Sequence, residues 1–228
     1  MTRILLILVP FISFSLVTSA QFKKNNILLG GQLSYSYNSS SNNQPPGYYT
    51  NNDSKVNSGN ITISLGKAFN ENTVVGINLS YLPTSIHNYQ AYGPAPLEYK
   101  NNGYAVGIFY RKYKNLGKEF YLFGQGSASY NWSDPSGKDS TGKKLFSGSS
   151  WGAGINLFPG IAYRISKHFF LELSIPDLFV ASYYKSNTAN QYGTVNEVLT
   201  TKNDQFTISS SLSSNPLDAL GIGFRLIL

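Results

Sequence analysis

The sequence predicts an all-β fold, an eight-stranded antiparallel up-and-down transmembrane β-barrel, and three patterns support this class. Apolar and polar residues alternate along eight segments, as in strands with two different faces. The connections between these segments alternate between long and short. Aromatic residues gather at both ends of the segments. Strands that turn an apolar face toward lipid and a polar face toward an enclosed interior produce this combination.

The hairpin formed by residues 153–165 and 169–175 shows the alternation most clearly. Its odd positions are apolar, and its even positions include polar and charged residues. The odd set is Ile155, Leu157, Ile161, Tyr163, Ile165, Phe169, Leu171, Leu173 and Ile175, and the even set includes Asn156, Arg164, Glu172 and Ser174. Charged residues in mid-strand, opposite a nearly unbroken apolar face, indicate a sheet whose apolar side faces lipid.

Six further segments have the same period of two. They are residues 27–37, 60–69, 73–82, 103–113, 120–132 and 220–228. Most are about as long as the roughly 9–11 residues that a tilted strand needs to cross a bilayer. An even number of strands places both ends of the barrel domain, expected over residues 21–228, on one side of the membrane. Lipid cannot satisfy an open sheet edge, so the first and last strands are expected to pair.

The connections follow the long and short pattern of a transmembrane barrel. The short connections are residues 70–72, 114–119 and 166–168, which are expected to be periplasmic turns. The long ones are rich in Asn, Ser, Gly, Tyr and Pro and are expected to be outer loops that could contact an extracellular protein or surface ligand. They are residues 38–59, 83–102, 133–150 and 184–204.

Aromatic residues on the apolar face are expected to form two girdles at the membrane interfaces. The outer girdle is predicted to contain Tyr35, Tyr37, Tyr81, Tyr130, Trp132 and Trp151. The inner girdle is predicted to contain Phe69, Tyr110, Phe120, Tyr163, Phe169 and Phe224. The alternative is the core of a soluble β-sandwich, for which we see no reason that loops should alternate in length.

The N-terminus predicts export. Arg3, an apolar run from Ile4 to Val17 and the small residues Thr18-Ser19-Ala20 are typical of a signal peptide over residues 1–20, cleaved near Ala20. The apolar run is too short for a spanning helix. The formal net charge of +7 is scattered rather than clustered, which indicates anionic lipid headgroups as partners rather than nucleic acid.

Four charged residues at inward positions fall near the short-turn end of the strands. They are Arg111, Arg164, Glu172 and Arg225. Buried charges require partners, so we expect a charged plug in which Glu172 bridges to Arg164 across the hairpin and to Arg225 on the last strand. A structural network is favoured, and a gate or narrow ion path is the alternative.

Two interruptions occur near the outer ends of the last two strands, at Pro176 and Asp177 and at Pro216 and Asp218. Proline and aspartate are poor residues for a lipid-facing ladder, so bulges or bends are expected there. Beyond the interruptions, residues 178–184 and 205–212 again have strand character. They predict either a hairpin above the membrane, with an edge open to a partner strand, or long loops.

Several segments of the sequence resemble the small outer-membrane β-barrel family, of the OmpA/OmpX type. The resemblance lies in Phe120–Gly126, in Phe158–Ile165 with Ser166–Phe170, and in the closing Gly221–Leu228. It implies the outer membrane of a Gram-negative cell and a non-enzymatic role in envelope integrity or surface interaction. Members of that family usually end in an aromatic residue, whereas this chain ends in Leu228 with Phe224 on the same face.

Two alternatives to this role remain. One is a narrow pore for ions or small solutes. The other is a lipid-modifying enzyme, which would need a histidine with serine or carboxylate partners near the outer leaflet. His87 stands alone in an outer connection, so we expect no enzyme, and the sequence contains no cofactor motif or metal-ligand cluster.

Overall fold

The computed structural model describes residues 23–40, 52–90, 98–139, 142–175, 177–191, 198–210 and 220–228. The predicted signal peptide, Pro176, Pro216 and Asp218 therefore lie outside the described residues. Among the residues that the structure describes, no helix has the length and apolar character of a membrane span.

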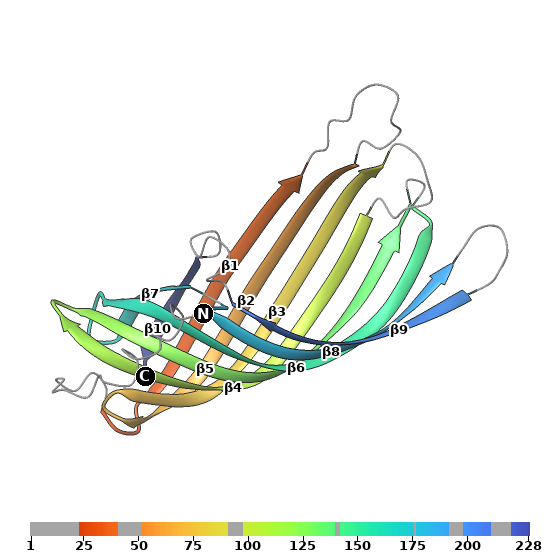
Figure 1. Cartoon of the computed structure of the whole chain (residues 1–228). Helices are drawn as coiled ribbons and strands as arrows, with labels where there is room; N and C mark the ends of the chain where they lie inside the picture. The colour runs from red at the N-terminus through yellow and green to blue at the C-terminus, as the bar shows by residue number, and fades with distance from the viewer. Residues whose placement is uncertain are drawn as a thin grey trace, which may run out of the picture.

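The described residues form strands joined by turns (Figure 1). The strands at the start of the chain are β1 (Ile27–Ser40), β2 (Asn52–Asn70), β3 (Thr73–Gln90), β4 (Glu98–Gly117), β5 (Phe120–Lys138) and β6 (Lys144–Arg164). They are followed by β7 (Phe169–Ser174), β8 (Phe179–Gln191), β9 (Val198–Ser209) and β10 (Gly221–Ile227).

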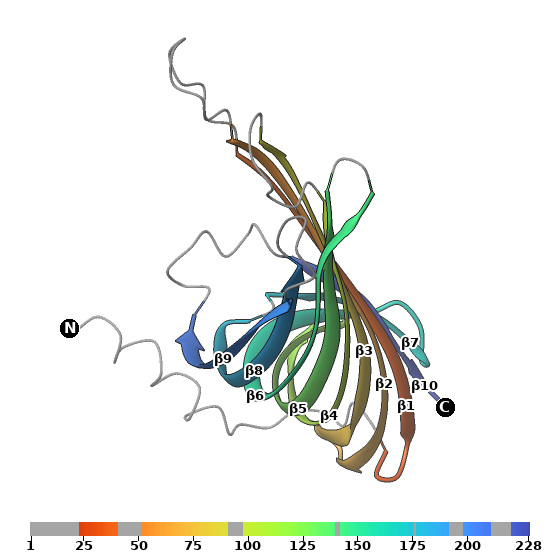
Figure 2. The same ribbon diagram turned by 90° about the vertical axis from the view of Figure 1, so that its right-hand side faces the viewer.

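Eight of these strands close into a ring. The ring runs β1-β2-β3-β4-β5-β6-β7-β10 and returns to β1, and every pair of neighbours is antiparallel. Figure 2 shows the wall curving from β8, β6, β5 and β4 around to β3, β2 and β1. Ring closure satisfies the backbone edges that lipid would leave unpaired. The predicted eight-stranded up-and-down barrel is confirmed.

The closing contact joins the two ends of the barrel domain. Leu28 to Leu33 of β1 pair with Ile227 to Ile222 of β10. The amide of Leu228 donates to the carbonyl of Ile27 at 2.8 Å, and the amide of Ile227 donates to the carbonyl of His168 at 2.8 Å. The first and last strands therefore meet at the short-turn end, as expected.

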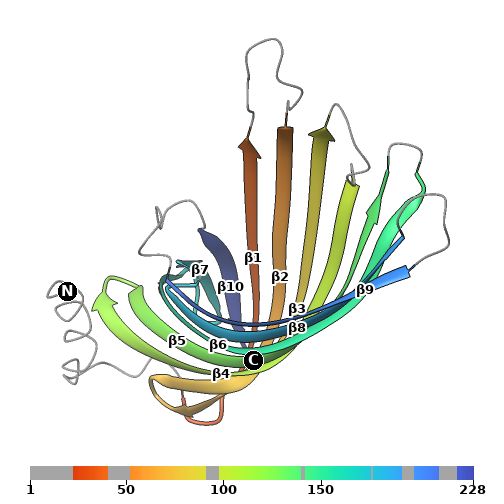
Figure 3. The same ribbon diagram turned by 45° about the vertical axis from the view of Figure 1, so that its right-hand side comes forward.

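The last two predicted strands are each divided. β6 pairs with β7 over Gly160–Arg164 and with β8 over Phe146–Leu157, so β7 and β8 succeed one another along β6. β9 pairs with β8 as a hairpin. In the described sheet β9 does not neighbour β1, and Figure 3 shows the two strands diverging toward their outer ends. The wall is a closed ring below and continues outward as two separate edges.

The long connections are shorter than predicted. The sequence placed loops over 133–150 and 184–204, but β5 extends to Lys138, β6 begins at Lys144, β8 extends to Gln191 and β9 begins at Val198. Likewise, β1 extends to Ser40, β2 begins at Asn52, β3 extends to Gln90 and β4 begins at Glu98. Polar residues there pair through backbone ladders, which require no apolar face.

The two faces of the wall differ as the alternation predicts. Large apolar residues on the odd positions of β6, such as Ile155, Leu157 and Ile161, are exposed to the outside. The inward positions near the short-turn end are filled with buried apolar and aromatic residues. This core contains Leu28, Ala68, Val74, Phe109, Tyr113, Tyr121, Phe123, Phe158, Ala162 and Phe170. The apolar outside is the surface that contacts lipid.

Candidate functional site

The centre of the lumen is a charge cluster on three strands. Arg111 of β4 donates from Nη1 to both carboxylate oxygens of Glu172 on β7, at 2.6 and 2.7 Å. Arg225 of β10 donates from Nε to Glu172 Oε1 at 3.0 Å. Two guanidiniums therefore share one carboxylate across the ring, and the cluster carries a net charge of +1.

Further hydrogen bonds join the cluster to neighbouring side chains. Arg111 Nε donates to Gln125 Oε1 at 2.7 Å, and Arg225 Nη1 donates to Ser64 Oγ at 3.3 Å. Tyr113 donates from its hydroxyl to Glu172 Oε1 at 3.1 Å. These hydrogen bonds give the buried charges the additional partners that they need in a low-dielectric interior.

The cluster is cut off from solvent. Arg111, Glu172 and Arg225 are 2%, 5% and 2% exposed. The Arg111 guanidinium lies 4.1 Å from the ring centroid of Phe123, which adds a cation–π contact. The buried rings of Phe109, Tyr121 and Phe170 fill the lumen around it. The charges and rings form a floor across the barrel.

The predicted partner of Arg164, Glu172, is wrong. Arg164 forms an ion pair with Glu119, in the turn between β4 and β5, rather than with Glu172. Glu172 lies directly across from Ala162, whereas Arg164 lies across from Phe170, nearer the rim. At the rim, the amide of Arg164 also donates to the Glu119 carbonyl at 2.9 Å. Arg164 therefore lies below the floor and outside the cluster.

Tyr113 is the member of the cluster that the sequence analysis missed. The alternation of the sequence indicates an inward position for Tyr113, because Phe109 and Arg111 face inward and Tyr113 follows at the same spacing of two. The tyrosine is fully buried and makes hydrogen bonds with both Arg111 and Glu172. Its hydroxyl is a third donor to Glu172 Oε1, which also accepts from Arg111 and Arg225.

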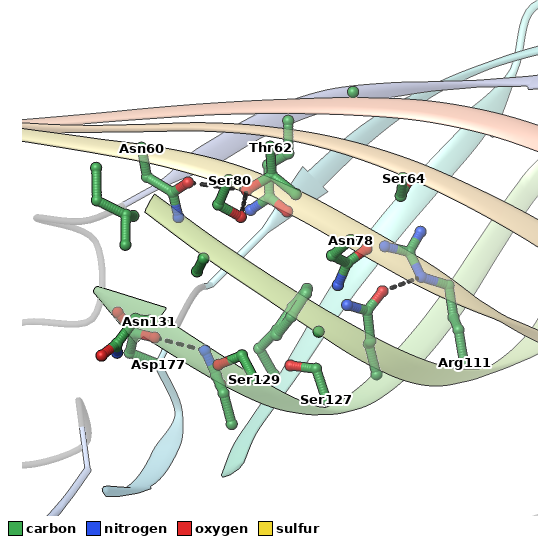
Figure 4. A pocket seen from close by; sticks show the side chains of 18 of the residues that line it. Asn60, Thr62, Ser64, Asn78, Ser80, Arg111, Ser127, Ser129, Asn131 and Asp177 are labelled. Carbon is green, nitrogen blue, oxygen red and sulfur yellow. Dashed lines mark hydrogen bonds between the residues drawn. The ribbon is translucent and has the colours of Figure 1, made fainter. Parts of the chain in front are cut away.

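Above the floor lies a polar cup with a volume of about 250 Å³. Figure 4 shows hydroxyl and amide side chains from several strands pointing into it. Thr62 donates to Asn60 Oδ1 at 2.8 Å and lies 2.7 Å from the Ser80 hydroxyl. Asn156 donates to Asp177 at 2.6 Å, while its own Oδ1 has no hydrogen-bond partner among the described residues.

Asp177 marks the interruption between β7 and β8. Its φ of 60° is in the left-handed region, which is uncommon for a residue other than glycine. The hydrogen bond from Asn156 holds its side chain at the cup. This break bends strand seven while β6 remains continuous behind it.

The predicted girdle residues all lie on the outward face. Tyr81, Tyr104, Trp132 and Trp151 follow one another across β3 to β6, and the ring centroids of Tyr104 and Trp132 are 5.9 Å apart. At the short-turn end, the Phe120 and Tyr163 rings are 4.8 Å apart, and those of Phe169 and Phe224 are 6.3 Å apart. Tyr104 and Tyr183 extend the outer row beyond the predicted set.

The outer end of β3 holds His87, the histidine considered for catalysis. His87 lies across from Glu98 in the β3–β4 register. Glu98 instead pairs with Lys100 at 2.6 Å. The hydrogen bond from Lys100 lowers the pKa of Glu98. No group of three histidine, cysteine, aspartate or glutamate side chains is arranged to hold a metal ion in the described part of the chain.

A closed antiparallel ring with an apolar outside and a polar inside defines an integral outer-membrane barrel of bacteria. The model of the outer membrane protein beta-barrel domain matches residues 5–213, and the chain belongs to this family. A search of curated proteins finds no match.

Solved structures of outer-membrane proteins are similar to this chain at low sequence identity. The outer membrane protein OprG from Pseudomonas aeruginosa has a TM-score of 0.53 at 14% identity, over 92% of this chain and 99% of that one. Neisserial surface protein A has a TM-score of 0.44 at 15% identity, over 89% and 97% of the two chains. A major outer membrane protein from Thermus thermophilus has a TM-score of 0.49 at 10% identity, over 89% and 99%.

Proposed function

We propose that this outer-membrane barrel does not conduct and acts, without enzymatic activity, in surface interaction and envelope integrity. The buried floor carries the first half of this proposal. A path for ions through the lumen would have to cross the Arg111–Glu172–Arg225 cluster, whose members are almost completely buried. An eight-stranded barrel is just wide enough for side chains to fill its interior.

The length of the strands supports the second half. β4, β5 and β6 have 20, 19 and 21 residues, about twice the number needed to cross a bilayer. Beyond Tyr104, Trp132 and Trp151 each of them continues for at least six residues, which corresponds to about 20 Å of projecting sheet. A paired sheet presents polar side chains in fixed positions, so its contacts with a partner cost less ordering than those of free loops.

Conductance in planar bilayers tests the first half. The wild-type barrel is expected to show no single-channel steps. Glu172→Gln removes the charge that pairs the two arginines and is the variant most able to open the floor. Single-channel steps in the wild type would establish a pore instead. Single-channel steps that occur only in folded Glu172→Gln would establish a gate.

Trimming the outer extension tests the second half. Ser133 and Ser150 are register partners on β5 and β6, so replacing residues 134–149 by Asn-Gly gives a tight hairpin above the membrane. Cells displaying this variant are expected to adhere less than wild-type cells to glass coated with serum albumin or with a polysaccharide. The matched control replaces residues 187–202 by Asn-Gly between the register partners Ser186 and Asn203. Comparing the two variants shows which of the two hairpins makes the adhesive contact.

Equal adhesion by wild-type and trimmed cells, with all barrels folded, would contradict the interaction role. Folding is checked by the change in gel mobility on boiling. The two halves of the proposal are tested on separate variants, so either can fail alone.

A further inference from the structure

We infer that the short-turn rim of the barrel holds a binding site for the headgroup of an anionic phospholipid. The site is a recess with a volume of about 370 Å³ between the residues that precede β1 and the β2–β3 hairpin. Lys24, Asn25, Lys67, Ala68, Phe69 and Val75 line it. The recess lies at the opposite end of the barrel from the projecting sheet, so this inference is independent of the proposed function.

Backbone contacts fix the first lysine beside the barrel. The amide of Asn25 donates to the carbonyl of Ala68 at 2.9 Å, and the amide of Ala68 donates to the carbonyl of Asn26 at 2.8 Å. Asn25 has a φ of 73°, so the chain turns sharply just after Lys24. The amide of Lys23 closes the turn by donating to Asn26 Oδ1 at 2.6 Å. Lys24 is therefore held next to the end of β2.

The second lysine is placed by the sheet. Lys67 lies between Ile27 on β1 and Val75 on β3 in one cross-strand row, on the outward face. Its neighbours on that face are apolar and exposed: Val75 is 45% exposed and Phe69 is 71% exposed. A lysine in an apolar, lipid-facing row extends its ammonium toward the headgroup region while its methylenes cover apolar surface.

Neither lysine is neutralised within the described structure. The ion pairs of the described residues use Lys100, Arg111, Arg164, Lys185 and Arg225 as cations. Glu71, the acid of the β2–β3 turn, forms no ion pair with Lys24 or Lys67. Lys24 and Lys67 both line the recess, and none of its lining residues is a carboxylate. A phosphodiester has the charge and the acceptor oxygens to contact two ammonium groups.

The apolar part of the recess indicates a lipid as the source of the phosphate. Phe69 and Val75 belong to the lipid-contacting outside of the wall, directly beside the lysines. A phospholipid can place its acyl chains along these residues and its phosphate between the ammonium groups. A free phosphate ion would gain nothing from the apolar side.

Native mass spectrometry of the folded barrel in non-ionic detergent tests the site, with phosphatidylglycerol and phosphatidylcholine of different mass in equal amounts. The wild type is expected to retain phosphatidylglycerol in preference. Lys24→Gln with Lys67→Gln is expected to weaken this binding about 25-fold, since a lysine near an anionic lipid contributes roughly fivefold. The matched control is Lys118→Gln with Lys167→Gln, which removes two exposed charges from other short turns.

Three results would overturn the inference. One is an equal loss of binding in both double variants, which would mean attraction to general positive charge. The second is the absence of a preference for phosphatidylglycerol in the wild type. The third is displacement of the lipid by an equal concentration of inorganic phosphate, which would make the site one for the free ion. The Phe69→Ser variant adds a check, because it should weaken lipid binding without changing phosphate binding.

Discussion

Glu172 is the residue on which the floor of the lumen depends. It is the one carboxylate that accepts from both Arg111 and Arg225 within the described residues. Removing one partner of a buried ion pair leaves the other charge uncompensated and typically costs about 3–5 kcal/mol. Here the substitution would leave two such charges in one enclosed volume.

We therefore expect Glu172→Gln to lower the free energy of unfolding by about 3–5 kcal/mol. Urea unfolding in lipid vesicles, followed by tryptophan fluorescence, measures the change. The matched control is Glu119→Gln, which breaks the exposed pair with Arg164 at the rim. Because this pair is exposed, the control should lower the free energy of unfolding much less than Glu172→Gln does. Equal midpoints for Glu172→Gln and the wild type would show that the cluster does not stabilise the barrel.

Glu119 provides a prediction in pH. Its hydrogen bond from Arg164 lowers its pKa below the ordinary value of 4.5. A carboxyl with a lowered pKa in the folded state stabilises that state above the unfolded pKa, and the contribution is lost as the pH falls through the folded value. NMR titration should find that Glu119 titrates below 4.5 and that Arg164→Gln moves it back upward. An unchanged pKa in the variant would mean that the pair does not persist in solution.

The packing of β2 against β3 depends on a single residue, Gly76. A Cβ at Gly76 would lie 2.2 Å from the Leu65 carbonyl oxygen and 2.7 Å from the Phe109 ring. Gly76 is the register partner of Gly66, so β2 and β3 approach closely beneath that ring. The close approach leaves room for the Phe109 ring, which lies 5.8 Å from the Arg225 guanidinium of the charge cluster.

Gly76→Ala is accordingly expected to reduce the yield of folded barrel severalfold, because the backbone oxygen cannot move aside. The fraction of protein that changes gel mobility on boiling measures folding. Gly126→Ala is the matched control: its Cβ would meet the Leu157 side chain at 3.1 Å, which can shift. The explanation fails if both variants fold equally well.

The β8–β9 hairpin makes a prediction for hydrogen exchange. β8 has β6 on one side and β9 on the other, whereas β9 has β8 as its single neighbour in the described sheet. Amides of β8 should therefore be protected throughout. Along β9, amides that point toward β8 should be slow and the alternate ones fast. Uniformly slow exchange along β9 would reveal a further partner strand, and uniformly fast exchange would exclude the hairpin.

The same elements show what the sequence can predict. The alternation predicted the ring strands because Ile, Leu and Tyr must face lipid at every second position. It could not predict how far β8 and β9 extend, since residues such as Asn187, Thr188, Thr201 and Lys202 are polar on both faces. Backbone pairing holds those parts together and leaves no periodic pattern in the side chains.

For the whole molecule, the sequence identified the inward charges and the pair between Glu172 and Arg225, but not the contact between Glu172 and Arg111. Arg111, Glu172 and Arg225 come from β4, β7 and β10, and their contact depends on the stagger of the strands around the ring. A sequence read strand by strand contains no measure of that stagger. Arg164 was misplaced for the same reason, because a shift of two residues along β6 takes it from the cluster to the rim.

The short strand β10 also has a consequence for the order of assembly. It joins β1 and β7, so the first strand of the barrel finds its second neighbour only after every other strand has been exported. Until then, two unpaired edges would face the membrane. Closure is expected to be slow, because bringing together segments that are far apart in the sequence costs conformational entropy. Insertion should therefore wait until β10 has been exported, and a chain that lacks β10 should accumulate on the periplasmic side as an unclosed sheet.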